Sequence, residues 1–283
     1  MTQAELPTGV ALEAFVAEVL AEDTGGNPAR GDRTAHAVIP ADAQLRASLT
    51  AREPLVPAGL AVAAAIFRAL DGHATITAEV ADGTPLESGA TLMRVSGNAR
   101  ALLTAERAAL NLVQHLSGIA TLTRAYADAI KGTGAVLLDT RKTLPGLRTL
   151  NKYAARMGGA VNHRMGLHDA VMIKDNHIAV AGSVTAAVAA ALAAGERDIQ
   201  VECDTLAQVD EALNAGATSL LLDNMSLADL RTAVARVDGR VPLEASGGVT
   251  LDTIRAIAET GVDRISVGRI TQSAPAIDIG MDY

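Results

Sequence analysis

The residues from Asp139 to His177 hold a group of side chains that could together bind a small anion. The whole chain is acidic, with a formal net charge of -8, yet basic residues outnumber acidic ones in this stretch. Cations gathered inside an acidic protein usually exist to hold an anion. The basic residues are Arg141, Lys142, Arg148, Lys152, Arg156, Arg164 and Lys174, against Asp139, Asp169 and Asp175.

Five side chains between Asp139 and His177 follow apolar runs closely enough to share one site: Arg141, Lys142, His163, Arg164 and Lys174. Any one of them alone would be better explained as ordinary surface charge. As a set at consecutive strand ends, they indicate a pocket. The fork of an arginine suits bidentate recognition of a carboxylate. More than one arginine therefore predicts a dicarboxylate ligand, or a carboxylate beside a phosphate.

Two acidic residues, Glu202 and Asp223, follow the next two apolar runs. They could cap helices or form structural salt bridges. They could equally coordinate Mg²⁺ carried by a phosphorylated substrate, or accept hydrogen bonds from ribose hydroxyls. Either carboxylate could also stabilise positive charge that develops on a sugar ring.

Glycines follow the last two apolar runs, at Ser246-Gly247-Gly248 and at Val267-Gly268. Each leads toward a helical segment. Loops in this position of an α/β barrel commonly bind phosphate through backbone N–H groups and a helix N-terminus. One such loop is a weak signal, and two at neighbouring strand ends predict a phosphate site more firmly.

The elements that would position these residues alternate between strand and helix after about residue 130. Continuous apolar strands that alternate with helices indicate a parallel sheet covered on its outer side. The predicted strands are Val136–Leu138, Gly159–Asn162, Val171–Ile173, Ile199–Val201, Ser219–Leu222, Val241–Leu243 and Arg264–Val267. The predicted helices between them are Val184–Ala194, Leu206–Ala215, Leu227–Val237 and Leu251–Glu259, with glycines at 195, 216 and 261 where helices should end.

Seven strands are too few for a complete eight-fold barrel, so the pattern predicts an incomplete, seven-stranded α/β barrel. Glu202, Asp223 and Glu244 are separated by 21 residues each, which is one strand–helix repeat. The carboxyl ends of barrel strands meet on one face, and that face carries the active site. The charged residues are therefore expected to converge there.

The first part of the chain mixes both kinds of element. Apolar residues at helical spacing predict helices, and alternating residues predict half-buried strands. The helices are Val10–Ala21, Leu60–Leu70 and a long segment from Ala99 to Ile130, broken near Ser117–Gly118; the strands are Leu45–Ala51, Ala74–Val80 and Thr91–Val95; the loop is Gly25–Asp32. We therefore predict an α+β open-sheet domain over residues 1–115 and the barrel over residues 116–283, with a C-terminal tail that returns to the first domain.

Composition excludes several classes of protein. Aromatic residues make up 2% of the 283 residues, which argues against a base-stacking surface, and the acidic charge argues against binding a nucleic-acid backbone. No uninterrupted apolar run reaches membrane-spanning length. A single cysteine, Cys203, fits a reducing compartment. We therefore expect a cytoplasmic protein with a small-molecule partner, bound neither to nucleic acid nor to a membrane.

The chain resembles the quinolinate phosphoribosyltransferase family from about Leu12 to Ile279. The resemblance rests on ERAALNLVQHLSGIAT, LLDTRKTLPGLR, GGAVNHRMGLHD, IKDNHI, LLLDNM, EASGGV and ISVG. DTRKTLPGLR followed by NHR and IKDNHI is highly specific. Two departures are Gly268-Arg269-Ile270-Thr271-Gln272, where the family has Gly-Ala-Leu-Thr-His, and Gly158-Gly159-Ala160 in place of a glycine triplet.

The resemblance implies an enzyme that moves a phosphoribosyl group from phosphoribosyl pyrophosphate to quinolinate, with loss of CO₂, to give nicotinate mononucleotide in NAD biosynthesis. It implies that Thr140, Arg141, His163, Arg164 and Lys174 surround quinolinate. It also implies that Lys142 faces the pyrophosphate, that Glu202 and Asp223 meet the ribose and Mg²⁺, and that Ser246, Gly247, Gly248, Val267 and Gly268 hold the 5′-phosphate. The implied catalytic residues are Lys142, Lys174, Glu202 and Asp223.

The resemblance further implies a homodimer in which Arg107 reaches the site of the second subunit, with a hexamer of dimers as the larger assembly. From its spacing alone, Glu106-Arg107 is as well explained by an exposed helical ion pair. Three other functions stay open. They are a phosphoribosyltransferase for another pyridine carboxylate, a Schiff-base aldolase using Lys174, and a sensor that binds a pyridine dicarboxylate without turnover.

Overall fold

The computed structural model describes residues 3–27 and 30–283, which form two compact units. Unit 1 consists of Ala125–Thr143 and Ala160–Gln272 together with Gln3. Unit 2 consists of Ala4–Arg124, Leu144–Gly159 and Ser273–Tyr283. The predicted boundary between residues 115 and 116 lies inside a long helix, and residues 144–159 and 273–283 group with unit 2.

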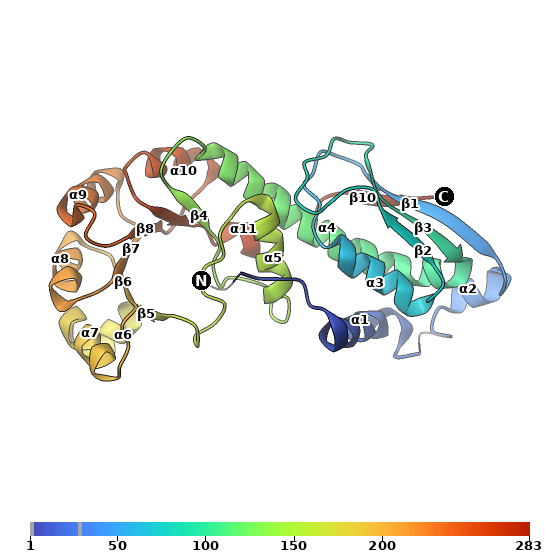
Figure 1. Cartoon of the computed structure of the whole chain (residues 1–283), viewed down its shortest axis with the longest axis horizontal. Helices are drawn as coiled ribbons and strands as arrows, with labels where there is room; N and C mark the ends of the chain where they lie inside the picture. The colour runs from blue at the N-terminus through green and yellow to red at the C-terminus, as the bar shows by residue number, and fades with distance from the viewer. Residues whose placement is uncertain (1–2, 28–29) are drawn as a thin grey trace. The chain divides into compact units, whose positions relative to one another are not determined.

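Unit 1 is built on a six-stranded parallel sheet with the strand order β4-β9-β8-β7-β6-β5 (Figure 1). Its strands are short apolar runs, and the central residues Leu220 and Leu222 are completely buried. The strands are β4 (Val136–Leu138), β5 (Val171–Ile173), β6 (Ile199–Cys203), β7 (Ser219–Asp223), β8 (Leu243–Ser246) and β9 (Arg264–Ser266). The helices are α6 (Asp175–Ala181), α7 (Val184–Ala193), α8 (Leu206–Ala215), α9 (Leu227–Val237), α10 (Leu251–Ala258) and α11 (Arg269–Gln272).

Local capping explains where several of these helices begin and end. The hydroxyls of Ser183, Thr205 and Ser226 accept backbone N–H bonds at the starts of α7, α8 and α9. Gly216 ends α8 in the left-handed conformation that only glycine adopts without cost. Pro242 has no N–H to give to a ladder, and β8 begins one residue later, at Leu243, so the predicted strand Val241–Leu243 was placed too early.

The predicted seven-stranded sheet has six strands, and the prediction of a strand at Gly159–Asn162 is wrong. This segment forms only one isolated bridge, between Val161 and Leu138. The chain leaves the sheet directly afterwards, because the next two residues, Asn162 and His163, form hydrogen bonds with the Asp139 carboxylate. That carboxylate accepts the His163 backbone N–H at 2.7 Å and the Asn162 side-chain amide at 2.6 Å. The barrel is therefore incomplete, as expected, but has one strand fewer.

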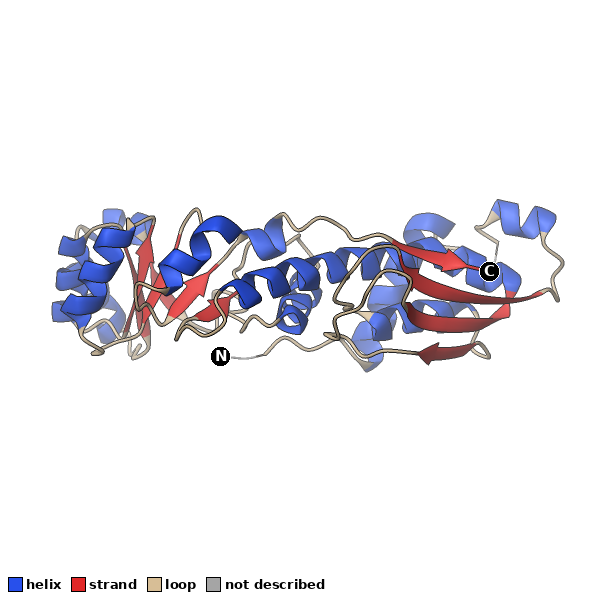
Figure 2. Ribbon diagram, turned by 90° about the horizontal axis from the view of Figure 1, so that it is seen from above, coloured by secondary structure: helices blue, strands red, loops and turns tan. Residues whose placement is uncertain are grey.

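Unit 2 contains a four-stranded antiparallel sheet with the order β10-β1-β3-β2 and helices packed against it (Figure 2). The side chains of β1 alternate between exposed and buried, and Leu49 is completely buried, as is Phe67 on the facing helix. The strands are β1 (Gln44–Ala51), β2 (Thr75–Ala78), β3 (Thr91–Asn98) and β10 (Ile279–Asp282). The helices are α1 (Gly9–Thr24), α2 (Arg33–Val38), α3 (Leu60–Leu70), α4 (Ala99–Ala129) and α5 (Arg148–Gly158).

Two of these elements, α2 and α5, have no counterpart in the sequence prediction, and β10 was predicted only as a C-terminal tail that returns to the first domain. The predicted loop Gly25–Asp32 follows the end of α1, although residues 28 and 29 lie outside the described residues. Strand β10, formed by the last residues of the chain, pairs with β1 from Ser48↔Asp282 to Ala51↔Ile279.

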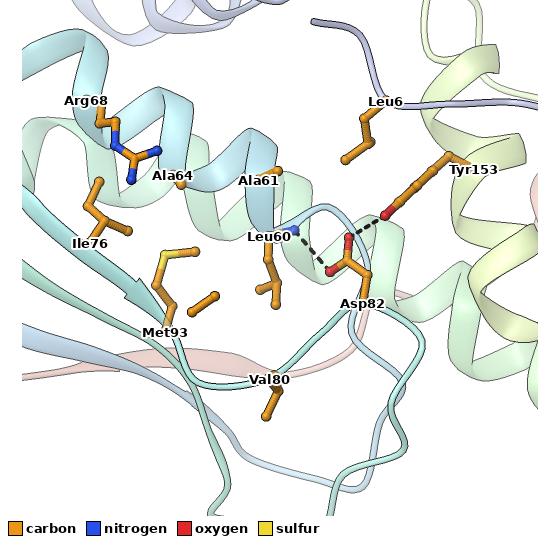
Figure 3. A pocket seen from close by; sticks show the side chains of 11 residues that line it. Leu6, Leu60, Ala61, Ala64, Arg68, Ile76, Val80, Asp82, Met93 and Tyr153 are labelled. Carbon is orange, nitrogen blue, oxygen red and sulfur yellow. Dashed lines mark hydrogen bonds between the residues drawn. The ribbon is translucent and has the colours of Figure 1, made fainter.

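Helix α5 is attached to unit 2 through a carboxylate at the end of a pocket of about 440 Å³ (Figure 3). The Asp82 carboxylate accepts the Tyr153 hydroxyl at 2.8 Å, and it accepts the backbone N–H groups of Gly59 and Leu60 at 2.8 and 3.3 Å. Burial raises the pKa of the Tyr153 hydroxyl, and the neighbouring Asp82 charge raises it further. One carboxylate thus caps α3 and binds α5.

Helix α4 is continuous, so the predicted break near Ser117–Gly118 is wrong. Both residues serve contacts instead. The Ser117 hydroxyl accepts the Ala58 backbone N–H at 3.1 Å. A side-chain carbon on Gly118 would overlap with the Pro275 carbonyl oxygen of the returning C-terminal segment. Glycine is therefore needed here because another part of the backbone lies against the helix.

The described residues contain no single helix that is both long and apolar enough to cross a membrane. Helices α6 and α7 meet that criterion only when they are taken as a pair, and they are bent by 87° relative to each other.

Replacing Gly118 by alanine should lower the free energy of unfolding by about 1–3 kcal/mol, because the added carbon overpacks a backbone contact. This loss should exceed the gain of up to about 1 kcal/mol that alanine brings to a helix interior. Gly134→Ala is the matched control, since nothing lies within 4 Å of the position and its φ is not positive. Urea unfolding of both variants measures the difference, and a Gly118→Ala protein as stable as the wild type would contradict the packing argument.

Candidate active site

All the predicted site residues except Arg107 belong to unit 1. Arg107 is an exposed residue of α4 in unit 2. Its neighbour Glu106 accepts the Tyr283 hydroxyl at 2.7 Å. Burial and the Glu106 carboxylate raise the pKa of Tyr283 to about 12.

The cationic side of the site begins at the end of β4, where Asp139 is completely buried. Its two hydrogen bonds to Asn162 and His163 fix the segment that carries Arg164. The following loop is fixed by Asp169, whose carboxylate accepts the Met165 and Gly166 backbone N–H groups at 2.6 and 2.9 Å. Burial opposes ionisation of Asp169, but these two hydrogen bonds outweigh it and lower the pKa of its carboxyl.

Two contacts fix the orientation of the His163 imidazole ring. Its Nδ1 accepts the Arg164 backbone N–H at 2.7 Å, so the ring proton must lie on Nε2. Nε2 then donates to the Glu244 carboxylate at 3.2 Å, which also accepts the Gln200 amide at 2.9 Å. Burial alone would raise the pKa of Glu244, which is 1% exposed, but the hydrogen bonds from His163, Ser266 and Gln200 lower it.

The guanidinium groups of Arg141 and Arg164 interact with each other. Burial lowers the pKa of Arg164, and the charge of Arg141 lowers it further, while Asp169, Glu202 and Glu244 act in the opposite direction. Arg164 donates to the Ala170 carbonyl at 3.3 Å and is 8% exposed. Two like charges held together in a partly buried place favour an anion that binds both.

Lys174 and Glu202 form an ion pair at the ends of β5 and β6. The register of these parallel strands, Ile173↔Val201, puts the next residues, Lys174 and Glu202, beside each other. Glu202 is 9% exposed, whereas Lys174 is half-buried. The pair therefore joins the predicted cationic set to the predicted acidic set.

Asp223 ends β7 beside Ser246 of β8, its register partner. Its carboxylate accepts the Asn224 side-chain amide at 2.6 Å, and the Asn224 backbone N–H donates to the Ser246 carbonyl at 2.9 Å. Gly247 and Gly248 follow with φ of 90° and 59°, which glycine adopts readily. The second acidic residue and the first glycine loop are thus neighbours.

Lys142 lies against the second glycine loop. Its Cδ is 2.7 Å from the place where a side-chain carbon on Gly268 would stand, and its carbonyl accepts the Thr271 hydroxyl at 2.7 Å. The Thr140 hydroxyl accepts the Lys142 backbone N–H at 3.0 Å. Val267 is buried, and its N–H donates to the Leu138 carbonyl at 3.0 Å, so that N–H is already used within the sheet.

The basic stretch from Asp139 to His177 is not one patch, which corrects the simplest interpretation of its charge. Arg148, Lys152 and Arg156 lie on α5 in unit 2. Lys152 is completely buried there, and Arg156 stacks on Tyr153 and pairs with Glu5 at 3.8 Å. The five basic residues singled out from the sequence are the ones that stay in unit 1.

Three residues with clear contacts in the site were not singled out from the sequence: Asn162, Gln200 and Asn224. Gln200 carried a usable signal, because it is a polar residue inside a buried apolar strand and such groups need a partner. Asn224 directly follows the carboxylate residue in LLLDNM, but adjacency alone does not reveal a left-handed backbone.

Within residues 3–27 and 30–283, no group of three or more His, Cys, Asp or Glu side chains could hold a metal ion. Glu202 is paired with Lys174, and Asp223 accepts from Asn224. One or two carboxylates are nevertheless a common partial shell for Mg²⁺ that arrives with phosphate oxygens. The residues therefore fit a metal that is carried mainly by a substrate.

Comparisons with known proteins agree over nearly the whole chain. The family models "Quinolinate phosphoribosyl transferase, N-terminal domain" and "C-terminal domain" match residues 32–117 and 119–282. The "Nicotinate-nucleotide pyrophosphorylase [carboxylating]" of Mycobacterium leprae is 48% identical over 258 residues, covering 89% of this chain and 90% of that protein. The solved nicotinate-nucleotide pyrophosphorylase of Francisella tularensis is 39% identical, with a TM-score of 0.93 over 100% of this chain and 99% of that one. The corresponding structure from Ehrlichia chaffeensis is 38% identical, with a TM-score of 0.91 over 97% and 99%. The chain therefore belongs to the quinolinate phosphoribosyl transferase family.

Proposed function

We propose that this chain transfers a phosphoribosyl group from phosphoribosyl pyrophosphate to quinolinate and decarboxylates the product. The products are nicotinate mononucleotide, pyrophosphate and CO₂, which makes this a step of de novo NAD biosynthesis. The observation that carries the proposal is the Lys174–Glu202 ion pair, in the same unit as Arg141 and Arg164, whose charges act on each other. The name of the Mycobacterium leprae relative supports it.

Quinolinate has two neighbouring carboxylates, and Arg141 and Arg164 are its proposed ligands. Both arginines keep their charge at neutral pH, because a guanidinium does not lose its proton in a protein. Without a ligand, the two cations repel each other. A bound dianion removes that repulsion and adds charge-assisted hydrogen bonds, each worth roughly 1.5–3 kcal/mol. His163 and Thr140 complete the proposed quinolinate set.

The donor is proposed to lie across the carboxyl ends of β6 to β9. Glu202 and Asp223 would accept hydrogen bonds from the ribose hydroxyls. The loops at Ser246-Gly247-Gly248 and Val267-Gly268 would hold the 5′-phosphate, with Lys142 facing the pyrophosphate. Mg²⁺ is proposed as the cofactor, held by Glu202, Asp223 and the donor, and it would neutralise charge on the leaving pyrophosphate.

In the proposed reaction, the quinolinate nitrogen forms a bond to the anomeric carbon while the bond to pyrophosphate breaks. The sugar passes through an oxocarbenium-like state, which the negative charges of Glu202 and Asp223 favour. The bond between the ring and the adjacent carboxylate then breaks and releases CO₂. Its electron pair stays on the ring carbon beside the positively charged nitrogen, and a proton replaces the lost group. Lys174 is the proposed stabiliser of the departing carboxylate.

The assembly and location are proposed from the family resemblance. Arg107 would reach the site of a second subunit in a homodimer, and its exposed position on α4 supports such a contact. A hexamer of such dimers is the proposed larger assembly. The cytoplasm is the proposed location.

The experiment that tests the function is an assay of nicotinate mononucleotide formation with quinolinate, phosphoribosyl pyrophosphate and Mg²⁺. Quinolinate labelled at the carboxyl next to the nitrogen reports CO₂ release in the same reaction. Nicotinate serves as the alternative acceptor. Equal amounts of nucleotide and CO₂, formed only with quinolinate, are expected. Turnover of nicotinate instead, or binding of quinolinate without product, would exclude the proposed reaction.

Arg141→Ala and Arg164→Ala should each weaken quinolinate binding by about 10- to 100-fold, since each removes a charge-assisted hydrogen bond. Glu202→Ala should mainly lower turnover, by about 100-fold, because its charge is needed in the transition state. Arg231→Ala, an exposed residue of α9, is the control. Steady-state kinetics and calorimetric titration with quinolinate separate the two effects. Equal loss of both parameters in all three site variants would refute this division of roles.

Mixing two inactive variants tests whether Arg107 acts across a subunit interface. At quinolinate concentrations well below the KM of the variants, Arg107→Ala and Arg164→Ala should each lose most activity. Dimers formed at random from equal amounts of both should regain about one quarter of the wild-type activity, because half of them are mixed and each mixed dimer has one intact site. Unfolding and refolding the two variants together supplies the mixture. No recovery, with mixed dimers confirmed by affinity tags, would place Arg107 in its own subunit's site.

A further inference from the structure

Asn224 has a backbone conformation that needs an explanation. Its φ is 53°, in the left-handed region that residues other than glycine seldom adopt. Across residues 3–27 and 30–283, the only other such residue is Asp238, with a φ of 48°. Asp238 simply ends α9. Asn224 lies between the end of β7 and the start of α9 and caps nothing.

The side chain of Asn224 is oriented by the carboxylate beside it. The Asp223 carboxylate can only accept, so the Asn224 amide nitrogen, at 2.6 Å from Asp223 Oδ2, must face it. The amide oxygen then faces the loop after β8. A side-chain carbon on Gly247 would overlap with that oxygen.

Backbone contacts hold the same residue from the other side. The Asn224 N–H donates to the Ser246 carbonyl at 2.9 Å. Gly247, with a φ of 90°, turns directly over the Asn224 amide. Asn224 therefore touches both the acidic residue Asp223 and the glycine loop, whose first residue, Ser246, is also the register partner of Asp223.

We propose that Asn224 is a positioning residue that keeps the Asp223 carboxylate and the Ser246–Gly248 turn at a fixed spacing. The inference rests on the proposed function, in which one donor molecule carries both the ribose hydroxyls and the 5′-phosphate. The binding of one donor molecule that contacts both the Asp223 carboxylate and the Ser246–Gly248 turn depends on the spacing between them. The binding of quinolinate, which is proposed to occur at the ends of β4 and β5, does not depend on that spacing.

Asn224→Gly is the main test variant, because glycine keeps the left-handed backbone and removes only the amide. The KM for phosphoribosyl pyrophosphate should rise about 10- to 100-fold and turnover should fall, since a hydrogen bond to a charged group is lost. The dissociation constant of quinolinate should stay within about twofold of wild type. Asp238→Gly likewise puts glycine at a left-handed position, but at the end of α9. It should leave the donor KM, the turnover and the dissociation constant of quinolinate unchanged.

Asn224→Asp supplies a second readout. It keeps the size of the side chain but places a carboxylate against Asp223. An ionised carboxylate can only accept, so the hydrogen bond to Asp223 is lost while the size of the side chain is kept. The KM for phosphoribosyl pyrophosphate should therefore rise at least as much as in Asn224→Gly, whereas the dissociation constant of quinolinate should stay within about twofold of wild type.

Three results would overturn the proposal. They are unchanged donor constants in Asn224→Gly, equal weakening of quinolinate and donor binding, and unchanged donor constants in Asn224→Asp. Thermal unfolding identifies a variant that is merely misfolded, and Asn224→Asp then decides through its constants for the donor and for quinolinate. If the wild type does not turn over quinolinate, the proposed function fails separately. Calorimetric titration of the wild type and of Asn224→Gly with phosphoribosyl pyrophosphate alone then tests the proposed role of Asn224 in donor binding.

Discussion

The repulsion between Arg141 and Arg164 is the constraint on which the organisation of unit 1 depends. Two guanidinium groups stay together only if the fold holds them there and if negative charge lies nearby. Asp139 holds the segment that carries Arg164, through Asn162 and His163. Asp169, Glu202 and Glu244 supply the compensating charge. The cations proposed to bind an anion are thus accompanied by carboxylates of the same unit, which explains how a basic cluster is kept in an acidic chain.

The carboxylates at the strand ends divide into two kinds, although their spacing in the sequence is uniform. Glu244 is 1% exposed and bonded to His163 and Gln200, so it fixes the tautomer of a site residue. Glu202 and Asp223 are more exposed, and each is held by one flexible or polar neighbour, Lys174 or Asn224. Glu202 and Glu244 both pair with Leu221 in the sheet, so burial and side-chain partners, rather than position along the strand, distinguish these carboxylates.

The sequence predicted the alternation of strands and helices in unit 1 because continuous apolar runs and capping residues are local signals. It failed where contacts between distant segments decide. Gly118 looks like a helix break until the Pro275 carbonyl lies against it. The basic residues of α5 look like part of the anion site until Asp82 binds Tyr153 and draws that helix into unit 2. The turn at Asn162 depends on Asp139, which lies 23 residues earlier.

The ion pair between Lys174 and Glu202 connects the two halves of the proposed chemistry. In this pair each side chain neutralises the other, so neither charge is left alone in a partly buried place. A quinolinate carboxylate can replace Glu202 as the partner of Lys174, and a donor hydroxyl can replace Lys174 as the partner of Glu202. Filling only one of the two positions leaves the other charge without its partner. Such an exchange favours occupation by both substrates together, which is the state that the transfer requires.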